Sequence, residues 1–494
     1  MLRRFCAVAV LLAAAPPLPA DLTPSGAIDP LFGGPTPGLF RYNRPDSTEV
    51  AGDLAIDSQG RLLVAFLVES SSEPGTHWPT VVRLTRDGAT DPTFGFLGVW
   101  SESTTPAHAP SSVRIAVDSF DRPLVGWTYE FDQGGTPNRD WGLRRLTVSG
   151  ANDLWKIVAF DLNGSGPGTR LDHLGDLMVW WDGRVIAVGD AQWSGDDTDF
   201  AVAVWAPDLS DDLHLDPTFD GDGRATAAFD VGGGIKADGA LTVSPWGTGF
   251  AAAGYAATPG GTDVAVARFT LLGGGLDPSF GTGGRARFAH TPLGGTPWER
   301  QVAYGAAESP GDSSLILAGR ADGPLNRQLA ALKIDLSGNV VPTWGVFGWY
   351  VRDLRYPGFP FDAADSRADG IVVDPLGGAL LAGGIYHPTS ADSLAVAVHL
   401  TVQGTSDADF SLDGAEYYSF EPAGEPTESF FSGVALQPGL ELTSAVVAGS
   451  MFGVTGGSSR TDWDAMASRI FVAPTIFVDG FESGNTSQWS LSQP

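Results

Sequence analysis

One stretch of the sequence carries oxygen ligands at the spacing of a calcium-binding loop. Asp161, Asn163 and Ser165 occupy positions 1, 3 and 5, Gly166 occupies position 6, and Asp172 occupies position 12. Ca²⁺ prefers several oxygen ligands around a sharp glycine turn, so this spacing indicates a calcium site formed by these four oxygen-bearing residues. Two departures weaken the match, because position 12 is an aspartate and no flanking helices are expected. They favour the alternative, an ordinary turn between two strands.

Other catalytic signatures are absent from the sequence. It contains no Gly-x-Ser-x-Gly elbow, no His-Glu-x-x-His pair, no Walker loop and no Gly-x-Gly-x-x-Gly opening a helix. The histidines are scattered singly, at positions 77, 108, 173, 214, 290, 387 and 399. Calcium is therefore the only cofactor that the motifs suggest, and no catalytic residue can be assigned from spacing.

Aromatic and basic residues gather in two of the longer loops, as Trp298 and Arg300, and as Arg355, Tyr356, Phe359 and Phe361. Such side chains would suit a platform for a carbohydrate or a peptide. The alternative, which we favour from the sequence, is that they close the outer rim of two long loops. The partner is thus expected to be an unknown protein or carbohydrate ligand.

The elements that position these loops form a repeat. The motif Asp-Pro-x-aromatic-Gly recurs, clearly at residues 29–33, 91–95 and 277–281 and in degraded form elsewhere. Its aromatic residue returns every 61 to 66 positions, at Phe32, Phe94, Trp155, Phe219, Phe280, Trp344 and Phe410. The chain is therefore expected to consist of seven copies of one unit of about 62 residues.

Each unit contains four short strands. Two apolar runs flank a tight turn, as in residues 54–64 and 178–189, and short alternating runs open and close the unit. Radial repetition of four-stranded sheets removes exposed sheet edges, so the fold class expected is all-β, a seven-bladed β-propeller. Since residues 38–41 look like a complete opening strand, the ring is expected to close by packing, with no strand exchanged.

The repeat resembles a known family. The run Leu276-Asp277-Pro278-Ser279-Phe280-Gly281, continued by Gly283-Gly284-Arg285, and the hairpin Leu436-Gln437-Pro438-Gly439 are similar to the delta-60 repeat of bacterial secreted proteins. The resemblance covers roughly residues 26–472. It implies a propeller-like array and an extracytoplasmic address, and it implies no reaction.

The two ends of the chain differ from the repeat. Arg3 and Arg4, an apolar run over 5–15 and small residues up to Ala20 predict a signal peptide at 1–20. The propeller is expected over 21–473. The tail over 474–494 contains Asp479-Gly480-Phe481-Glu482-Ser483 and is similar to tails of exported Gram-negative proteins, so it is either a sorting signal or an edge strand. A secreted or periplasmic protein, in part associated with the cell surface, is expected.

Composition limits the partners. The net charge of −29 repels nucleic acid and anionic lipid, and no later stretch is apolar enough to insert into a membrane. Cleavage of the signal would remove Cys6, the single cysteine. Without an oligomerisation signal, a monomer is the default.

The function expected from the sequence alone is a non-catalytic binding or surface-interaction scaffold. Its ligand would bind on the face that carries the long irregular loops, because variable loops on a rigid scaffold usually carry function. The alternative is a propeller enzyme, a lyase or a hydrolase, with its site on that same face. A convergence of histidine, arginine, tyrosine or carboxylate side chains from several units at the channel would favour the enzyme.

Overall fold

The structure, a computed structural model, describes residues 25–472. Within that range residues 35, 108–112, 133–136, 161, 163–170, 208–212, 233–235, 272, 358–363, 388, 391, 421–427, 438–443 and 456–457 lie outside the description. The described residues form 28 strands and no helix. Consequently, no helix among them could span a membrane.

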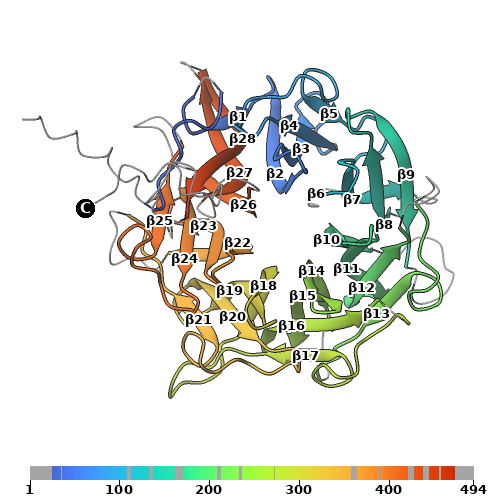
Figure 1. The fold of residues 1–494 in the computed structure, drawn as a ribbon, viewed down its shortest axis with the longest axis vertical. Helices are drawn as coiled ribbons and strands as arrows, with labels where there is room; N and C mark the ends of the chain where they lie inside the picture. The colour runs from blue at the N-terminus through green and yellow to red at the C-terminus, as the bar shows by residue number, and fades with distance from the viewer. Residues whose placement is uncertain are drawn as a thin grey trace, which may run out of the picture.

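The strands form six hydrogen-bonded sheets arranged in a ring, five with four strands and one with eight (Figure 1). The first three in chain order are β2 (Ser47–Ile56), β3 (Leu62–Ser70), β4 (His77–Leu84) and β5 (Val99–Ser101); β6 (Val113–Val117), β7 (Pro123–Asp132), β8 (Pro137–Leu146) and β9 (Asn152–Val158); and β10 (His173–Val179), β11 (Val185–Ser194), β12 (Asp197–Trp205) and β13 (Arg224–Ala227).

The eight-stranded sheet consists of two halves that pair only through Thr262 and Arg300. The first half contains β14 (Asp238–Trp246), β15 (Gly249–Thr258), β16 (Gly261–Thr270) and β17 (Arg285–Phe288), and the second contains β18 (Arg300–Glu308), β19 (Leu315–Asp322), β20 (Arg327–Ile334) and β21 (Trp349–Arg352). The last two sheets are β22 (Asp365–Val373), β23 (Ala379–Tyr386), β24 (Ser393–Leu400) and β25 (Ala415–Tyr418), followed by β26 (Ser429–Leu436), β27 (Ser444–Thr455), β28 (Ser458–Phe471) and β1 (Phe40–Tyr42).

The ring closes by strand exchange, so the expectation of closure by packing alone is wrong. Strand β1 pairs antiparallel with β28, and Arg469 of β28 forms an ion pair with Asp29 at 2.6 Å. The run at 38–41 is thus the outermost strand of the last sheet and does not open the first. Pairing the two ends of the chain in one sheet ties the first and last segments of the ring together.

The Asp-Pro-x-aromatic-Gly motif forms the turn between the third and fourth strands of a sheet. Asp277 accepts a hydrogen bond from the backbone N–H of Ser279 at 2.9 Å and forms an ion pair with Arg268 of β16. The Phe280 ring beside it is fully buried. Equivalent pairs join the third strand to the turn at Arg83–Asp91, Arg145–Asp153, His399–Asp407 and Arg469–Asp29. We call these the outer ion pairs.

The innermost strands carry a recurring β-bulge. Register shifts leave one unpaired residue in six of them, namely Gly52, Gly175, Leu241, Tyr304, Asp369 and Ser432. Glycine recurs opposite the bulge, and a Cβ at Gly319 would lie 1.9 Å from the Val302 carbonyl oxygen. The small residues that end the second strand of each unit therefore make room for the bulge, which turns a side chain toward the centre of the ring.

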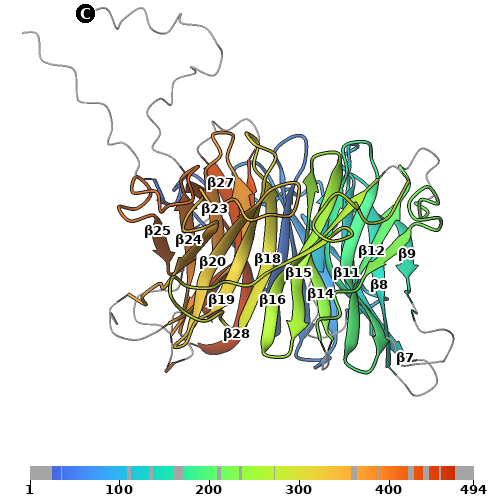
Figure 2. The ribbon, with the colours of Figure 1, turned by 90° about the horizontal axis from the view of Figure 1, so that it is seen from below.

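Two kinds of loop share one face, which we call the irregular-loop face: the loops that join one sheet to the next, and the loops that join the second and third strands within a sheet. Ala107, in a loop of the first kind, forms β-bridges with His77 and Tyr129, which lie next to loops of the second kind. The innermost strands begin at this face and run across the thickness of the disc (Figure 2). Residues in the first half of an innermost strand therefore lie toward the irregular-loop face.

Candidate active site in the central channel

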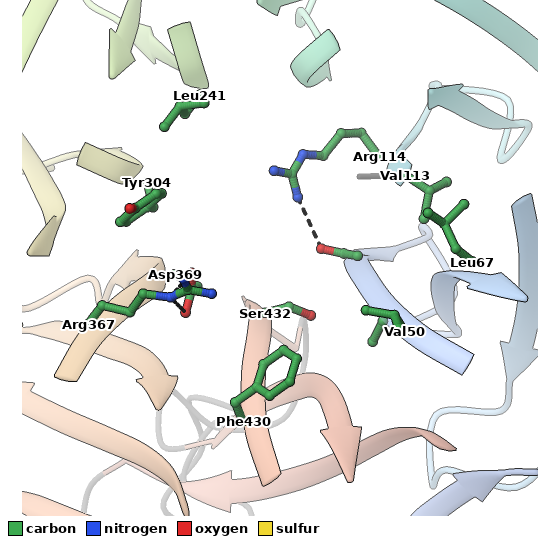
Figure 3. A pocket seen from close by; sticks show the side chains of 12 residues that line it. Val50, Leu67, Val113, Arg114, Leu241, Tyr304, Arg367, Asp369, Phe430 and Ser432 are labelled. Carbon is green, nitrogen blue, oxygen red and sulfur yellow. Dashed lines mark hydrogen bonds and ion pairs between the residues drawn. The ribbon is translucent and has the colours of Figure 1, made fainter. Parts of the chain in front are cut away.

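The bulges surround a cavity of about 350 Å³ in the channel. Five of the six unpaired bulge residues line it, and side chains from six separate sheets or half-sheets converge there (Figure 3). Its lining consists of Val50, Ala51, Gly52, Leu67, Val113, Arg114, Leu241, Tyr304, Arg367, Asp369, Phe430 and Ser432.

Arg367 and Asp369 of β22 form an ion pair on the wall of this cavity. The Arg367 Nε lies 2.9 Å from one Asp369 carboxylate oxygen and 3.0 Å from the other. Burial raises the pKa of the Asp369 carboxyl, although Arg367 opposes that rise. Burial also opposes the charge of Arg367, but Asp369 more than offsets it and raises the pKa of the guanidinium. The pair therefore holds a fixed positive group and a basic carboxylate side by side.

Two tyrosine rings flank the Arg367 guanidinium. The Arg367 Cζ lies 5.5 Å from the ring centroid of Tyr304 and 5.9 Å from that of Tyr386. Burial raises the pKa of Tyr304, while the nearby Arg320 and Arg367 oppose the rise. Burial raises the pKa of Tyr386 to about 12. Both hydroxyls therefore keep their protons at neutral pH and are proton donors.

Arg114 enters the cavity from the other side. Its Nε donates to the Gly175 carbonyl oxygen at 2.5 Å and its Nη1 donates to the Gly52 carbonyl oxygen at 3.1 Å. These carbonyls belong to the bulges of the two neighbouring sheets, so the β-bulges fix the position of the guanidinium. Figure 3 shows the side chain extending into the space bordered by Tyr304 and Leu241.

Two half-buried carboxylates, Asp53 and Asp176, flank Arg114. The oxygens of Asp53 accept the backbone N–H groups of Leu54 and Ile115, at 2.7 and 3.0 Å. Asp176 likewise accepts backbone N–H groups, one of them from the next sheet at 2.9 Å. Burial raises the pKa of Asp53 to about 6 and also raises that of Asp176, with Arg114 opposing both. These carboxylates join adjacent sheets and support Arg114.

The lining of the cavity is part polar and part apolar. Arg114, Tyr304, Arg367 and Asp369 supply the charges and the hydroxyl, whereas Val50, Leu67, Val113 and Phe430 supply aliphatic and aromatic surface. A few convergent polar groups in an otherwise apolar pocket are typical of a small-molecule site.

A second cavity, of about 630 Å³, adjoins the first. Both are lined by Leu241 and Tyr304, and the second is also lined by Tyr255, Arg300 and Arg320. The β15–β16 turn over residues 258–262 borders it, which places it at the irregular-loop face.

The predicted calcium loop is described only at its last ligand. Asp161, Asn163 and Ser165 lie outside the described residues. Asp172 is fully buried, and its two carboxylate oxygens accept the backbone N–H groups of Phe160 at 2.9 Å and Gln192 at 3.1 Å. This carboxylate anchors a connection between sheets, and its role as a calcium ligand stays a prediction. No group of three or more histidine, cysteine or acidic side chains among the described residues is placed to hold a metal.

The aromatic and basic loop residues fall into two groups. Arg300 lines the second cavity, whereas Tyr356 is buried against the His387 ring, with centroids 5.0 Å apart. Trp298 packs on His290 with centroids 4.7 Å apart. Part of the predicted platform therefore closes a loop, and Arg300 belongs to the channel.

Sequence reasoning missed the residues that converge in the cavity. Arg114, Tyr304, Arg367 and Asp369 belong to no motif. One signal was available in the repeat itself. When its copies are aligned on the bulge, the position of Arg367 is occupied in the other units by Val50, His173, Gly239, Val302 and Phe430. A charged residue in a column of mostly small and apolar residues marks a break in the repeat.

No family model and no curated protein match the chain. Solved structures with a similar arrangement of sheets include a protein of unknown function from Dyadobacter fermentans, with 12% identity and a TM-score of 0.44 over 87% of this chain and 99% of that one. The polysaccharide lyase Uly1 has 10% identity and a TM-score of 0.42, covering 88% and 100%. An α-L-arabinofuranosidase from Fusarium graminearum has 12% identity and a TM-score of 0.39, covering 78% and 99%.

The expectation of a non-catalytic scaffold is corrected by the side chains of the channel. Arginine, tyrosine and aspartate side chains from different sheets converge in the channel, which is the arrangement that favours an enzyme.

Proposed function

We propose that the protein is an enzyme that cleaves a carboxylate-bearing saccharide by elimination, at the cavity lined by Arg114, Tyr304, Arg367 and Asp369. The observation that carries this proposal is the convergence of two arginines, a protonated tyrosine and a basic carboxylate on one cavity. The four residues come from three different sheets or half-sheets, so only the closed ring brings them together.

The arginines favour a carboxylate as the recognised group. Guanidinium groups bind carboxylates through charge-assisted hydrogen bonds, and two of them border the same cavity. The chain as a whole carries a net charge of −29, so an anionic ligand would need the local field of these two arginines to bind in the channel. The apolar residues of the lining would suit the carbon face of a sugar ring.

In this proposal each side chain has one role. Arg114 and Arg367 bind the substrate carboxylate and neutralise the charge that develops on it, which acidifies the adjacent C–H bond. Asp369 removes that proton, because burial makes it a stronger base than an ordinary aspartate. The electron pair forms a carbon–carbon double bond, the β carbon–oxygen bond breaks, and the Tyr304 hydroxyl protonates the departing oxygen.

Elimination fits these residues better than hydrolysis does. Glycoside hydrolysis ordinarily uses two carboxyl groups on either side of the scissile bond. Asp369 is the single carboxylate among the described residues that line the first cavity. An elimination needs only one base together with cations that stabilise an enolate-like intermediate.

The test is an incubation with polygalacturonate and with neutral galactan as control. We expect a rise in ultraviolet absorbance from an unsaturated uronate with polygalacturonate alone, and its loss in Arg367→Ala. Reducing ends that appear without this absorbance would show hydrolysis and overturn the elimination. Failure of the protein to bind or cleave any uronate polymer would overturn the substrate class.

The number of blades and the export of the protein are part of the same proposal. Counting β14–β17 and β18–β21 as separate blades, because a single residue pair joins them, gives seven blades of the delta-60-like repeat. The predicted signal peptide at 1–20 supports an exported enzyme, acting where polysaccharides are met.

A further inference from the structure

We infer that the second cavity extends the proposed active site, so that the substrate is a polyanionic saccharide chain and not a single acidic sugar. This inference rests on the proposed function, since it concerns the same substrate. It predicts that one charged unit lies between Arg114 and Arg367, while the preceding units lie along Arg320 and Arg300.

The two cavities adjoin each other. Leu241 and Tyr304 line both, and their volumes are about 350 and 630 Å³. Tyr304 therefore stands at the junction, where the proposed reaction places the scissile bond. A substrate cleaved at Tyr304 would have one part in each cavity.

The second cavity is also cationic. Arg300 and Arg320 line it, and no carboxylate is among the described residues of its lining. Asp322 lies 3.5 Å from the Arg320 Nε, and Asp190 and Asp238 lie near the Tyr255 side chain of the same wall. Together, the described residues of the two linings include four arginines and one acidic residue, Asp369. Four guanidinium groups and one carboxylate therefore face a ligand in the two adjoining cavities, which suits a ligand with several carboxylates.

The shape of the mouth suits a chain that continues into solvent. The second cavity is bordered by Pro259, Gly260 and Gly261, and the two glycines have no side chain that could obstruct its opening. A Cβ on Gly260 would meet no heavy atom within 4 Å, so a side chain could project there without disturbing the fold. The Tyr255 ring, which lies across Gly239, adds an aromatic surface of the kind on which sugars stack.

The test is binding of galacturonate oligomers of one, two and four units, measured by calorimetry with Asp369→Asn to prevent turnover. We expect affinity to rise at least tenfold from one unit to four. Gly260→Trp should abolish that gain and leave the affinity for the single unit unchanged, and Arg300→Ala should reduce the gain. Gly311→Trp is the matched control, because Gly311 also meets no heavy atom within 4 Å and lies in the β18–β19 turn, away from this mouth.

Equal affinity for all lengths, or equal losses for short and long oligomers in Gly260→Trp, would overturn the inference. Cleavage by the unmodified protein without any length dependence would leave the proposed function standing and remove this extension. Length-dependent binding without cleavage would overturn the proposed function and leave this extension of the binding site standing. Tetraglutamate that binds as tightly as the tetrasaccharide would assign the cavities to an acidic peptide and overturn the saccharide class.

Discussion

Arginine–aspartate pairs occur in two regions of this molecule, and their surroundings differ. The outer ion pairs, such as Arg268–Asp277 and Arg145–Asp153, join the third strand of a sheet to the turn that follows it. The aspartate also accepts backbone N–H groups of its own turn, as Asp277 does from Ser279. The Arg367–Asp369 pair instead borders an open cavity, between two tyrosine rings.

The difference separates structural pairs from a functional one. The outer pair recurs at five of the motif turns, where it fixes the same kind of turn, so its residues appear as part of a motif. The channel pair occurs in one sheet, where the equivalent positions elsewhere are mostly small or apolar. A site on a repeat protein is therefore to be sought where the repeat is broken.

The largest effect should come from breaking an outer pair. Arg268→Ala leaves Asp277 buried without its cation, and removing one partner of a buried pair costs about 3–5 kcal/mol. Chemical denaturation of Arg268→Ala should show a fall of this size in the free energy of unfolding. The folded fraction should retain full activity per molecule, and a loss of activity without loss of stability would contradict the division between the two regions.

The channel pair should show the opposite behaviour. Arg367→Ala removes a group proposed to stabilise the developing charge, so kcat should fall by about 10²–10³-fold. The melting temperature should change little, because this pair borders a cavity and joins no turn. Arg367→Lys keeps the charge but loses the planar fork, and should recover only part of the rate. An Arg367→Ala variant with near-normal kcat would remove Arg367 from the site.

Activity should have a bell-shaped dependence on pH, with both limbs shifted to higher pH. The proposed reaction needs Asp369 ionised and Tyr304 protonated, and burial raises the pKa of both. The acidic limb should therefore lie above the usual range of aspartate, and the alkaline limb above that of tyrosine. Tyr304→Phe should lower kcat and abolish the alkaline limb, and a limb that persists in this variant would assign it to another group.

A smaller effect concerns stability against pH. The pKa of Asp53 rises from 3.8 to about 6 on folding, so the folded state keeps this proton to higher pH than the unfolded state does. The carboxyl therefore contributes stability at low pH that is lost as the pH rises from 3.8 to 6. Asp53→Asn should remove this part of the pH dependence in denaturation curves, whatever its absolute stability. An unchanged slope would contradict the raised pKa.

The smallest effect should be that of chelation. Both oxygens of Asp172 already accept backbone N–H groups, so we expect the thermal midpoint to be the same with and without a calcium chelator. A midpoint that falls on chelation and recovers with added Ca²⁺ would restore the predicted calcium loop.

The all-β class, the repeat and the motif that recurs in it can be predicted from local patterns in the sequence. These are local properties, because alternating apolar residues and Asp-Pro turns act within about ten residues of each other. The exchange of β1 into the last sheet was not evident, since the run at 38–41 reads equally well as the first strand of one sheet or the last of another.

The site was decided by the tertiary structure alone. Arg114 lies 190 residues before Tyr304 in the chain, and neither stands in a motif. The β-bulges turn these side chains inward, and closing the ring brings them to the same cavity. Convergence at a central channel depends on the rotation of each sheet about the ring, which no short stretch of sequence encodes.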